Sequence, residues 1–426
     1  MKKRGESHRK IFWTAAIGIA LAVVGFGGCG RKENTMKTAE DAVEPVWEDE
    51  ITVMHVDAGD ARFVAYVEEL QERLQMKINL LPYPANADSR HAKVSSLLAA
   101  GDSSVDIFAV NDEMINAFKN EGYLEPLQDD VMNEETAWAF QQEYLRTTTM
   151  VGDQIYSAPY MLDVLALWIN EEYLKEAGLT GIETEEQFRS FLAYDWGEGR
   201  YAYGGSWEKT YVFNELGELI NLFGGDYFDW DNEKTREAVL FLKECIDRGY
   251  TPKDQMIDQY EQMNQKFIDG KYGMVFMYSG SFKKYMDAGV YGKDKIHVTP
   301  LPDLGGNHVT YIGTWQYALN KASKHKETAK RFMSYAVSRE GSRLYAEMLN
   351  SFPARADLLG EDLDITGYAE ICDFLNSVEM QVRPIPANSM EYIETVGELF
   401  QKYMLEELDL DSYCDQMQEL VDENIK

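Results

Sequence analysis

The sequence predicts an α/β protein with two domains. Short apolar runs alternate with amphipathic stretches whose apolar residues recur at helical spacing, the pattern of strands followed by helices. The chain has 426 residues. About 400 of them remain beyond an apolar N-terminal segment, which is more than one hydrophobic core usually supports. We therefore expect two α/β units.

The first 28 residues have the composition of a secretory signal. Five basic residues and one acidic residue precede an apolar run at 11–28 that ends in small residues directly before Cys29. The ending Phe-Gly-Gly-Cys resembles a bacterial lipobox, in which the cysteine is lipidated and becomes the first residue of the mature chain. Because the apolar run is about long enough to span a bilayer, an uncleaved anchor is the alternative.

Residues 29–50 are polar and charged, with almost no periodic apolar positions, which predicts a flexible tether. The whole chain carries 41 Lys and Arg against 73 Asp and Glu, a formal charge of −32. This surplus of negative charge argues against nucleic acid as a partner, and more weakly against anionic ligands.

No motif in the sequence indicates catalysis, a cofactor or a metal. The G-x-S-x-G, H-E-x-x-H, Walker and G-x-G-x-x-G patterns are all missing. Beyond Cys29, only Cys245, Cys372 and Cys414 remain, too few for a closed disulfide framework and without metal-ligand spacing. A glycosidase with two acidic groups stays an alternative, because 73 carboxylates offer many pairs.

The first unit begins with alternating strands and helices. Strands are predicted at 51–57, 76–81 and 105–110, and helices at 61–75 and 89–100, from apolar runs and from apolar residues on one helical face.

In the second unit the apolar runs predict strands at 164–170, 272–278, 296–302 and 311–319. A helix is predicted at 234–248, where Gly249 supplies the C-terminal stop. Helices then predominate to the end of the chain.

Four stretches resemble the family 1 extracellular solute-binding proteins, the group that contains maltose-binding protein. They are VDIFAVNDE at 105–113, the run from GDQIYSAPY to LKEAGL at 152–179, FIDGKYGM at 267–274, and a set of four short segments: PLP at 300–302, GTW at 313–315, residues 329–335 and FPAR at 352–355. Their order and spacing cover nearly the whole chain after the signal. Two departures are Ser157, where the family has Gly, and one fewer Gly before Trp315.

The resemblance implies the class II fold of periplasmic binding proteins: two α/β lobes joined by three hinge crossings, with the ligand between them. Crossings near residues 158, 308 and 355 place residues 51–157 and 308–354 in lobe 1, and residues 158–307 and 355–426 in lobe 2. The implied protein is a monomeric lipoprotein on the outer face of a bacterial cell membrane, held there by its lipid anchor only. It is no enzyme and needs no cofactor. It captures a mono- or oligosaccharide and delivers it to the permease subunits of an ABC transporter.

Sugars present apolar C–H faces and many hydroxyls, so their sites combine aromatic platforms with polar side chains. On this chemistry and the resemblance, we predict that nine residues contact the ligand: Asp57, Asn111, Asp112, Tyr160, Asp163, Trp207, Tyr278, Trp315 and Arg355.

Several of these residues have a structural alternative. Trp315 is expected to stack on a sugar because the family places an aromatic there, but it could be a core residue. Asn111 could instead cap a helix. Trp207 follows a Gly-Gly-Ser loop and could form a cleft platform or a surface cap. Arg355 could hold the hinge rather than the ligand.

Two other functions stay open from the sequence. One is a binding protein for a non-sugar solute, such as a polyamine or a short peptide. The other is a secreted carbohydrate-active enzyme, which would need an acid and a base at fixed separation.

Overall fold

The computed structural model describes residues 47–84 and 87–425. The predicted signal peptide, Cys29 and most of the predicted tether lie outside these residues. None of the helices in the described part has the length and apolar character needed to cross a membrane.

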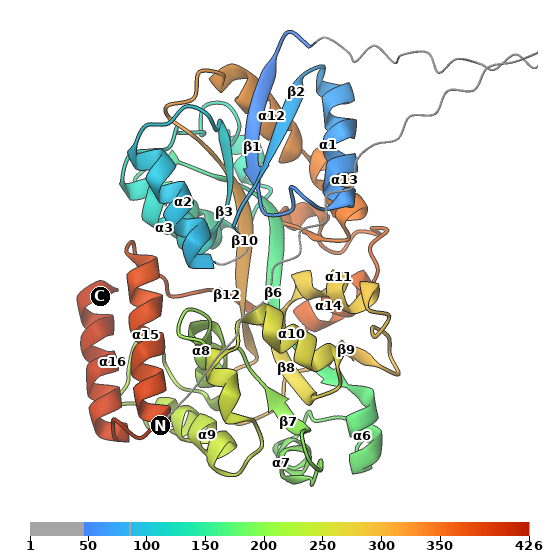
Figure 1. Cartoon of the computed structure of the whole chain (residues 1–426), viewed down its shortest axis with the longest axis vertical. Coiled ribbons are helices and arrows are strands. Elements are labelled where there is room, and N and C mark those ends of the chain that lie inside the picture. The colour runs from blue at the N-terminus through green and yellow to red at the C-terminus, as the bar shows by residue number, and fades with distance from the viewer. Residues whose placement is uncertain (1–46, 85–86, 426) are drawn as a thin grey trace, which may run out of the picture. The chain divides into compact units, whose positions relative to one another are not determined.

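A ten-stranded mixed sheet runs through the described chain, in the order β2-β1-β3-β10-β6-β8-β7. Its two long strands, β6 (Ala158–Asn170) and β10 (Val309–Leu319), lie side by side and antiparallel (Figure 1). The other strands on this path are β1 (Glu50–His55), β2 (Lys77–Pro82), β3 (Ile107–Asn111), β7 (Tyr201–Gly204) and β8 (Tyr272–Tyr278). Three short strands pair with β6 or β10: β9 (Ile296–Val298), β11 (Phe352–Pro353) and β12 (Glu379–Val382).

The first lobe is built on β1, β2 and β3, which are parallel to one another. Its core includes Phe63, Ile107 and Tyr345, all fully or almost fully buried. Helix α1 begins at the cap Asp60, whose carboxylate accepts the N–H of Arg62 at 2.8 Å. The longer helices of this lobe are α1 (Ala61–Leu74), α2 (Ala87–Ala99), α3 (Asp112–Asn120), α12 (Lys326–Ala336) and α13 (Arg339–Leu349). Shorter elements are α4 (Glu134–Ala137), α5 (Gln142–Tyr144), β4 (Met150–Val151) and β5 (Gln154–Ile155).

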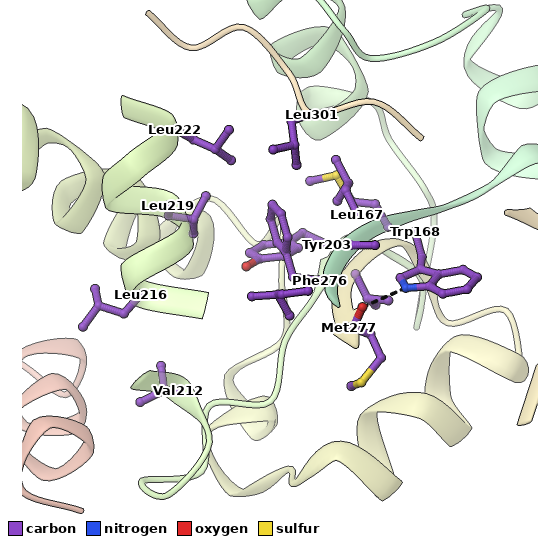
Figure 2. Close-up of a cluster of buried hydrophobic side chains, with 14 of the residues drawn as sticks. Leu167, Trp168, Tyr203, Val212, Leu216, Leu219, Leu222, Phe276, Met277 and Leu301 are labelled. Carbon is purple, nitrogen blue, oxygen red and sulfur yellow. Dashed lines mark hydrogen bonds between the residues drawn. The ribbon is translucent and has the colours of Figure 1, made fainter. Parts of the chain in front are cut away.

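The second lobe has its own hydrophobic core. Figure 2 shows Leu219 of α8 (Val212–Phe223) lying toward Tyr203 and Phe276 from the adjacent strands β7 and β8. The indole N–H of Trp168 donates to the carbonyl of Met277 at 2.9 Å, which satisfies the one polar atom of that buried ring. The remaining helices of this lobe are α6 (Glu171–Ala177), α7 (Glu185–Ala193), α9 (Glu233–Asp247), α10 (Tyr260–Ile268), α11 (Phe282–Asp287), α14 (Tyr368–Leu375), α15 (Ser389–Met404) and α16 (Leu410–Asn424).

The chain passes between the two cores at three places. Strand β6 passes from the core of the first lobe, at Tyr160, to the core of the second. Strand β10 returns from the second core, at Ile312, to the first core, at Tyr317. At the third place, residues of the two cores alternate along the chain, with Leu349 in the first core, Phe352 in the second, and Ala354 packed against the first. The predicted limits of the two lobes, residues 51–157 with 308–354 and residues 158–307 with 355–426, stay a prediction.

Candidate ligand-binding site

Two strand ends converge at the middle of the sheet. Strands β3 and β12 lie end to end along one edge of β10, where β3 is antiparallel to β10 and β12 is parallel to it. Asn111 ends β3 opposite Trp315, and Val382 ends β12 opposite Ile312. Because the two strands run toward each other, their carboxyl ends meet beside Gly313. Such a meeting of carboxyl ends is where open α/β sheets place their ligands.

On the other edge of β10, Asp163 of β6 lies opposite Gly313. Its carboxylate accepts the backbone N–H of Gly280 at 2.7 Å and the hydroxyl of Ser279 at 3.1 Å. Burial raises the pKa of Asp163 to about 6 despite these hydrogen bonds. A polar row therefore crosses the sheet from the end of β8 to the junction of β3 and β12.

Arg383 is the centre of this junction. Its guanidinium is buried and donates through Nε to Asp112 at 3.2 Å, and through Nη2 to the other oxygen of the same carboxylate. It also donates to Glu113 at 2.5 Å and to Asn214 at 2.7 Å. Asp112 and Glu113 begin helix α3 of the first lobe, whereas Asn214 belongs to α8 of the second. Arg383 thus ties the two lobes together.

Two tyrosines extend the polar row on the side of the second lobe. The hydroxyl of Tyr278 donates to Asn214 at 3.1 Å, and the amide of Asn214 donates to the hydroxyl of Tyr260 at 2.8 Å. The two rings lie 6.0 Å apart and edge to face, and the guanidinium carbon of Arg383 lies 6.0 Å from the Tyr278 ring. The two tyrosine rings therefore lie next to the hydrogen-bonding groups of Asn214 and Arg383.

The charges at the site favour a ligand without negative charge. Burial raises the pKa of Asp112 to about 6, and the Arg383 guanidinium opposes that rise. The carboxylates of Asp112 and Glu113 pair with Arg383, and the charge of Arg383 also acts on the carboxylate of Asp163. An anionic group brought into the same place would be repelled, while hydroxyls could donate to the carboxylate of Asp163.

Trp315 lies beside this row, on β10 between Asn111 of β3 and Met161 of β6. Its side chain is half-buried, and part of it packs against the core of the first lobe. The guanidinium carbon of Arg90 lies 5.4 Å from its ring centre. Stacking of Trp315 on a sugar stays a prediction.

Asp57 follows strand β1 and Asn111 ends strand β3, and these two strands of the first lobe are parallel. Burial raises the pKa of Asp57, and the ammonium of Lys283 opposes that shift. Asn111 caps α3, because its side-chain oxygen accepts the N–H of Met114 at 3.1 Å, and its amide donates to Glu113 at 2.5 Å. Asn111 therefore has the capping role that the sequence offered as its alternative. Ligand contacts of Asp57 and Asn111 stay predictions.

The cleft platform predicted at Trp207 is wrong, and so is the alternative of a surface cap. This ring is fully buried in the second core, edge-on to Phe400 at 5.3 Å. Its indole N–H donates to the buried carboxyl of Glu215 at 2.7 Å. Because that carboxyl satisfies the N–H inside the core, the ring needs neither solvent nor ligand.

Tyr160 and Arg355 have structural roles. The ring of Tyr160 stacks on Tyr317 at 4.2 Å and is almost fully buried within the first core. Arg355 donates to Asp357 at 2.8 and 2.9 Å and to the carbonyl of Val337 at 3.0 Å. These contacts fit the hinge role that the sequence left open for Arg355, and ligand contacts of both residues stay predictions.

Arg383, Asn214 and Tyr260 were missed by the sequence reasoning. Arg383 is 271 residues from Asp112, and it follows a four-residue edge strand that carries no recognisable pattern. Within residues 47–84 and 87–425, no three His, Cys, Asp or Glu side chains lie together as a metal site would require. Cys245, Cys372 and Cys414 are free thiols.

Comparisons with known proteins agree on one family. Residues 58–342 match the model of the bacterial extracellular solute-binding proteins. A maltooligosaccharide ABC transporter solute-binding lipoprotein of Streptococcus pneumoniae is 21% identical over 366 residues, 81% of each chain. The maltodextrin-binding protein MdxE of Bacillus subtilis is 24% identical over 232 residues, 51% of this chain and 54% of that one.

Solved structures of low sequence identity share the fold. A maltose-bound T. maritima protein, MalE3, has a TM-score of 0.75 at 17% identity, over 87% of this chain and 98% of that one. A Listeria monocytogenes ABC substrate-binding protein in complex with cycloalternan has a TM-score of 0.74 at 16% identity, over 88% and 98%. The predicted two-lobed α/β fold is thus confirmed. The chain belongs to family 1 of the bacterial extracellular solute-binding proteins, the group that resembles maltose-binding protein.

Proposed function

We propose that this protein captures a neutral oligosaccharide between its lobes and delivers it to the permease of an ABC importer. It does so without altering the sugar, as a monomer, from a lipid anchor at Cys29 on the outer face of the bacterial membrane. The proposal assigns residues 51–157 and 308–354 to one lobe and residues 158–307 and 355–426 to the other.

The observation that carries the proposal is the polar row across the sheet. Asp163 offers a carboxylate held by Gly280 and Ser279, Tyr278 offers an aromatic ring, and Arg383 neutralises part of the charge next to them. This combination suits a ligand with many hydroxyls and no charge. The relatives named above carry maltooligosaccharides or maltodextrins in their names, so α-linked glucose oligomers are the first ligands to test.

A thermal-shift screen tests the proposal directly. Maltotriose and maltohexaose are compared with spermidine and a tripeptide on the purified protein. A sugar at a hundred times its dissociation constant is expected to stabilise the folded state by about 2.7 kcal/mol, which raises the melting temperature. The bound sugar should be recovered unchanged in length.

The matched variant is Asp163→Asn, whose side-chain oxygen can still accept from Gly280 and Ser279. It should keep the melting temperature of the ligand-free protein and lose most of the shift caused by the sugar. A shift with spermidine alone would establish the polyamine alternative, and shortened oligosaccharides would establish the enzyme alternative.

Anchoring is tested with Cys29→Ser. The thiol is the group that would be acylated, so the variant is expected to leave the membrane fraction or to keep its signal segment. Cys372→Ser is the control, because it makes the same change at a free thiol of the folded part and should leave membrane retention unaltered. Normal cleavage with unchanged membrane retention in Cys29→Ser would contradict the lipoprotein assignment.

A further inference from the structure

Four charged side chains form an alternating chain between the two lobes. The ammonium of Lys283 pairs with the carboxylate of Asp60, which lies 3.6 Å from Arg62 Nε. Nη2 of Arg62 in turn lies 3.0 Å from the carboxylate of Asp287. Asp60 and Arg62 are at the start of α1 in the first lobe, and Lys283 and Asp287 are on α11 in the second. We call these four residues the clasp.

The clasp adjoins the candidate site on both sides. Asp60 comes three residues after Asp57, and the ammonium of Lys283 also acts on the carboxyl of Asp57. Lys283 comes three residues after Gly280, whose backbone N–H holds Asp163 at 2.7 Å. The clasp therefore joins the two segments that would have to separate when the cleft opens at this edge.

Three of the four side chains of the clasp are partly covered and share partners, unlike those of an isolated surface pair. The side chains of Asp60 and Lys283 are only 23% and 24% exposed and that of Arg62 is 34% exposed, whereas that of Asp287 is 62% exposed. Isolated exposed pairs contribute little, but linked charges that share partners in partly covered positions contribute more. The capping bond from Asp60 to Arg62 also holds its carboxylate in place before any partner arrives.

We propose that the clasp, through its pair of Arg62 and Asp287, raises ligand affinity by stabilising the arrangement in which the lobes are closed. This inference rests on the proposed function, because it assumes a ligand bound between the lobes. A ligand that contacts both lobes binds in proportion to the population of the closed form. Loss of the clasp should therefore weaken binding without changing any group of the polar row.

The test uses charge reversal and rescue. Arg62→Glu and Asp287→Arg each place like charges together across the two lobes, and the double variant restores an opposite pair. Each single variant is expected to bind maltohexaose about fivefold more weakly in low salt, and the double variant within about twofold of the native protein. High salt should shrink the differences, because it screens exposed charges.

Arg73→Glu is the matched control. Arg73 lies on the same helix, and the charge change is the same, but its partners Glu69 and Glu340 both belong to the first lobe, at 2.7 and 2.5 Å. It should leave the affinity for maltohexaose unchanged.

Hydrogen–deuterium exchange of the ligand-free full-length protein supplies a readout that needs no sugar. Peptides covering 56–64 and 279–288 should exchange faster in both single variants, and at the native rate in the double variant. The proposed role of the clasp would be overturned by an unchanged affinity for maltohexaose in both single variants, or by a double variant that does not recover the native affinity. If the native protein binds no sugar, the proposed function fails, whereas unchanged exchange in the single variants would refute the clasp independently.

Discussion

Arg383→Met is expected to lower the free energy of unfolding by about 3–5 kcal/mol at pH 8, because it leaves buried carboxylates without their cation. The guanidinium makes four hydrogen bonds, to Asp112, Glu113 and Asn214. Methionine fills a similar volume but can replace none of them. Urea unfolding of the ligand-free protein, followed by circular dichroism, measures the loss.

The pH dependence of this loss distinguishes electrostatics from packing. The folded-state pKa of Asp112 is already raised to about 6 by burial, and removal of Arg383 should raise it further. Below that pKa the carboxyl takes up a proton and no unpaired charge stays buried. The difference from the native protein should therefore shrink as the pH falls from 8 to 5.

A second substitution tests the same account. Asp112→Asn in the Arg383→Met background removes the buried charge and should recover part of the lost stability. A loss that is equal at pH 5 and pH 8, and is not recovered by Asp112→Asn, would mean that Arg383 acts through packing alone.

Trp315→Ala is expected to weaken sugar binding by about 2 kcal/mol, roughly thirtyfold, because it removes a flat apolar surface beside the polar row. The ring is half-buried and packs partly against the first core, so some loss of stability in the ligand-free protein is also expected. Titration calorimetry and thermal unfolding of the same variant separate the two effects.

Trp207→Ala provides the comparison, since that ring is fully buried in the second core. It should lower the free energy of unfolding by about 3–5 kcal/mol, as large-to-small core changes do. If Trp315→Ala shows a similar loss of stability and binds sugar normally, Trp315 is a core residue and the stacking role fails.

Local patterns predicted the strands and helices well where one face or both faces of an element are apolar. The strand predicted at 272–278 is β8, and the helix predicted at 234–248 is α9 within one residue at each end. Strand limits were wrong where proline occurs. The strand predicted at 296–302 ends at 298, before Pro300 and Pro302, which cannot donate to a ladder.

Strand β6 deviates in the opposite direction. Its prediction began at residue 164, but the strand starts at 158 and includes Pro159. The pairing with β10 shifts between Trp315 and Gln316, beside Pro159, so the sheet accommodates a residue without an N–H at an irregularity. That β6 tolerates Pro159 is visible only from its pairing with β10, which lies far along the chain.

From the sequence, an α/β protein could be predicted, and the family resemblance implied the two-lobed fold that is confirmed; the ligand contacts predicted with it stay predictions. Asp112 and Asp163 were predicted as ligand contacts because each flanks a strand predicted from local patterns. In the structure Asp112 directly follows β3, whereas Asp163 lies within β6. The tertiary structure alone decided that Arg383 pairs with Asp112 and that Trp207 lies in the core. Both outcomes depend on partners far along the chain or hidden in the core: the carboxylate of Asp112 for Arg383, and that of Glu215 for Trp207. Whether a polar group faces a ligand or the interior depends on which partner satisfies it, and folding alone brings that partner near.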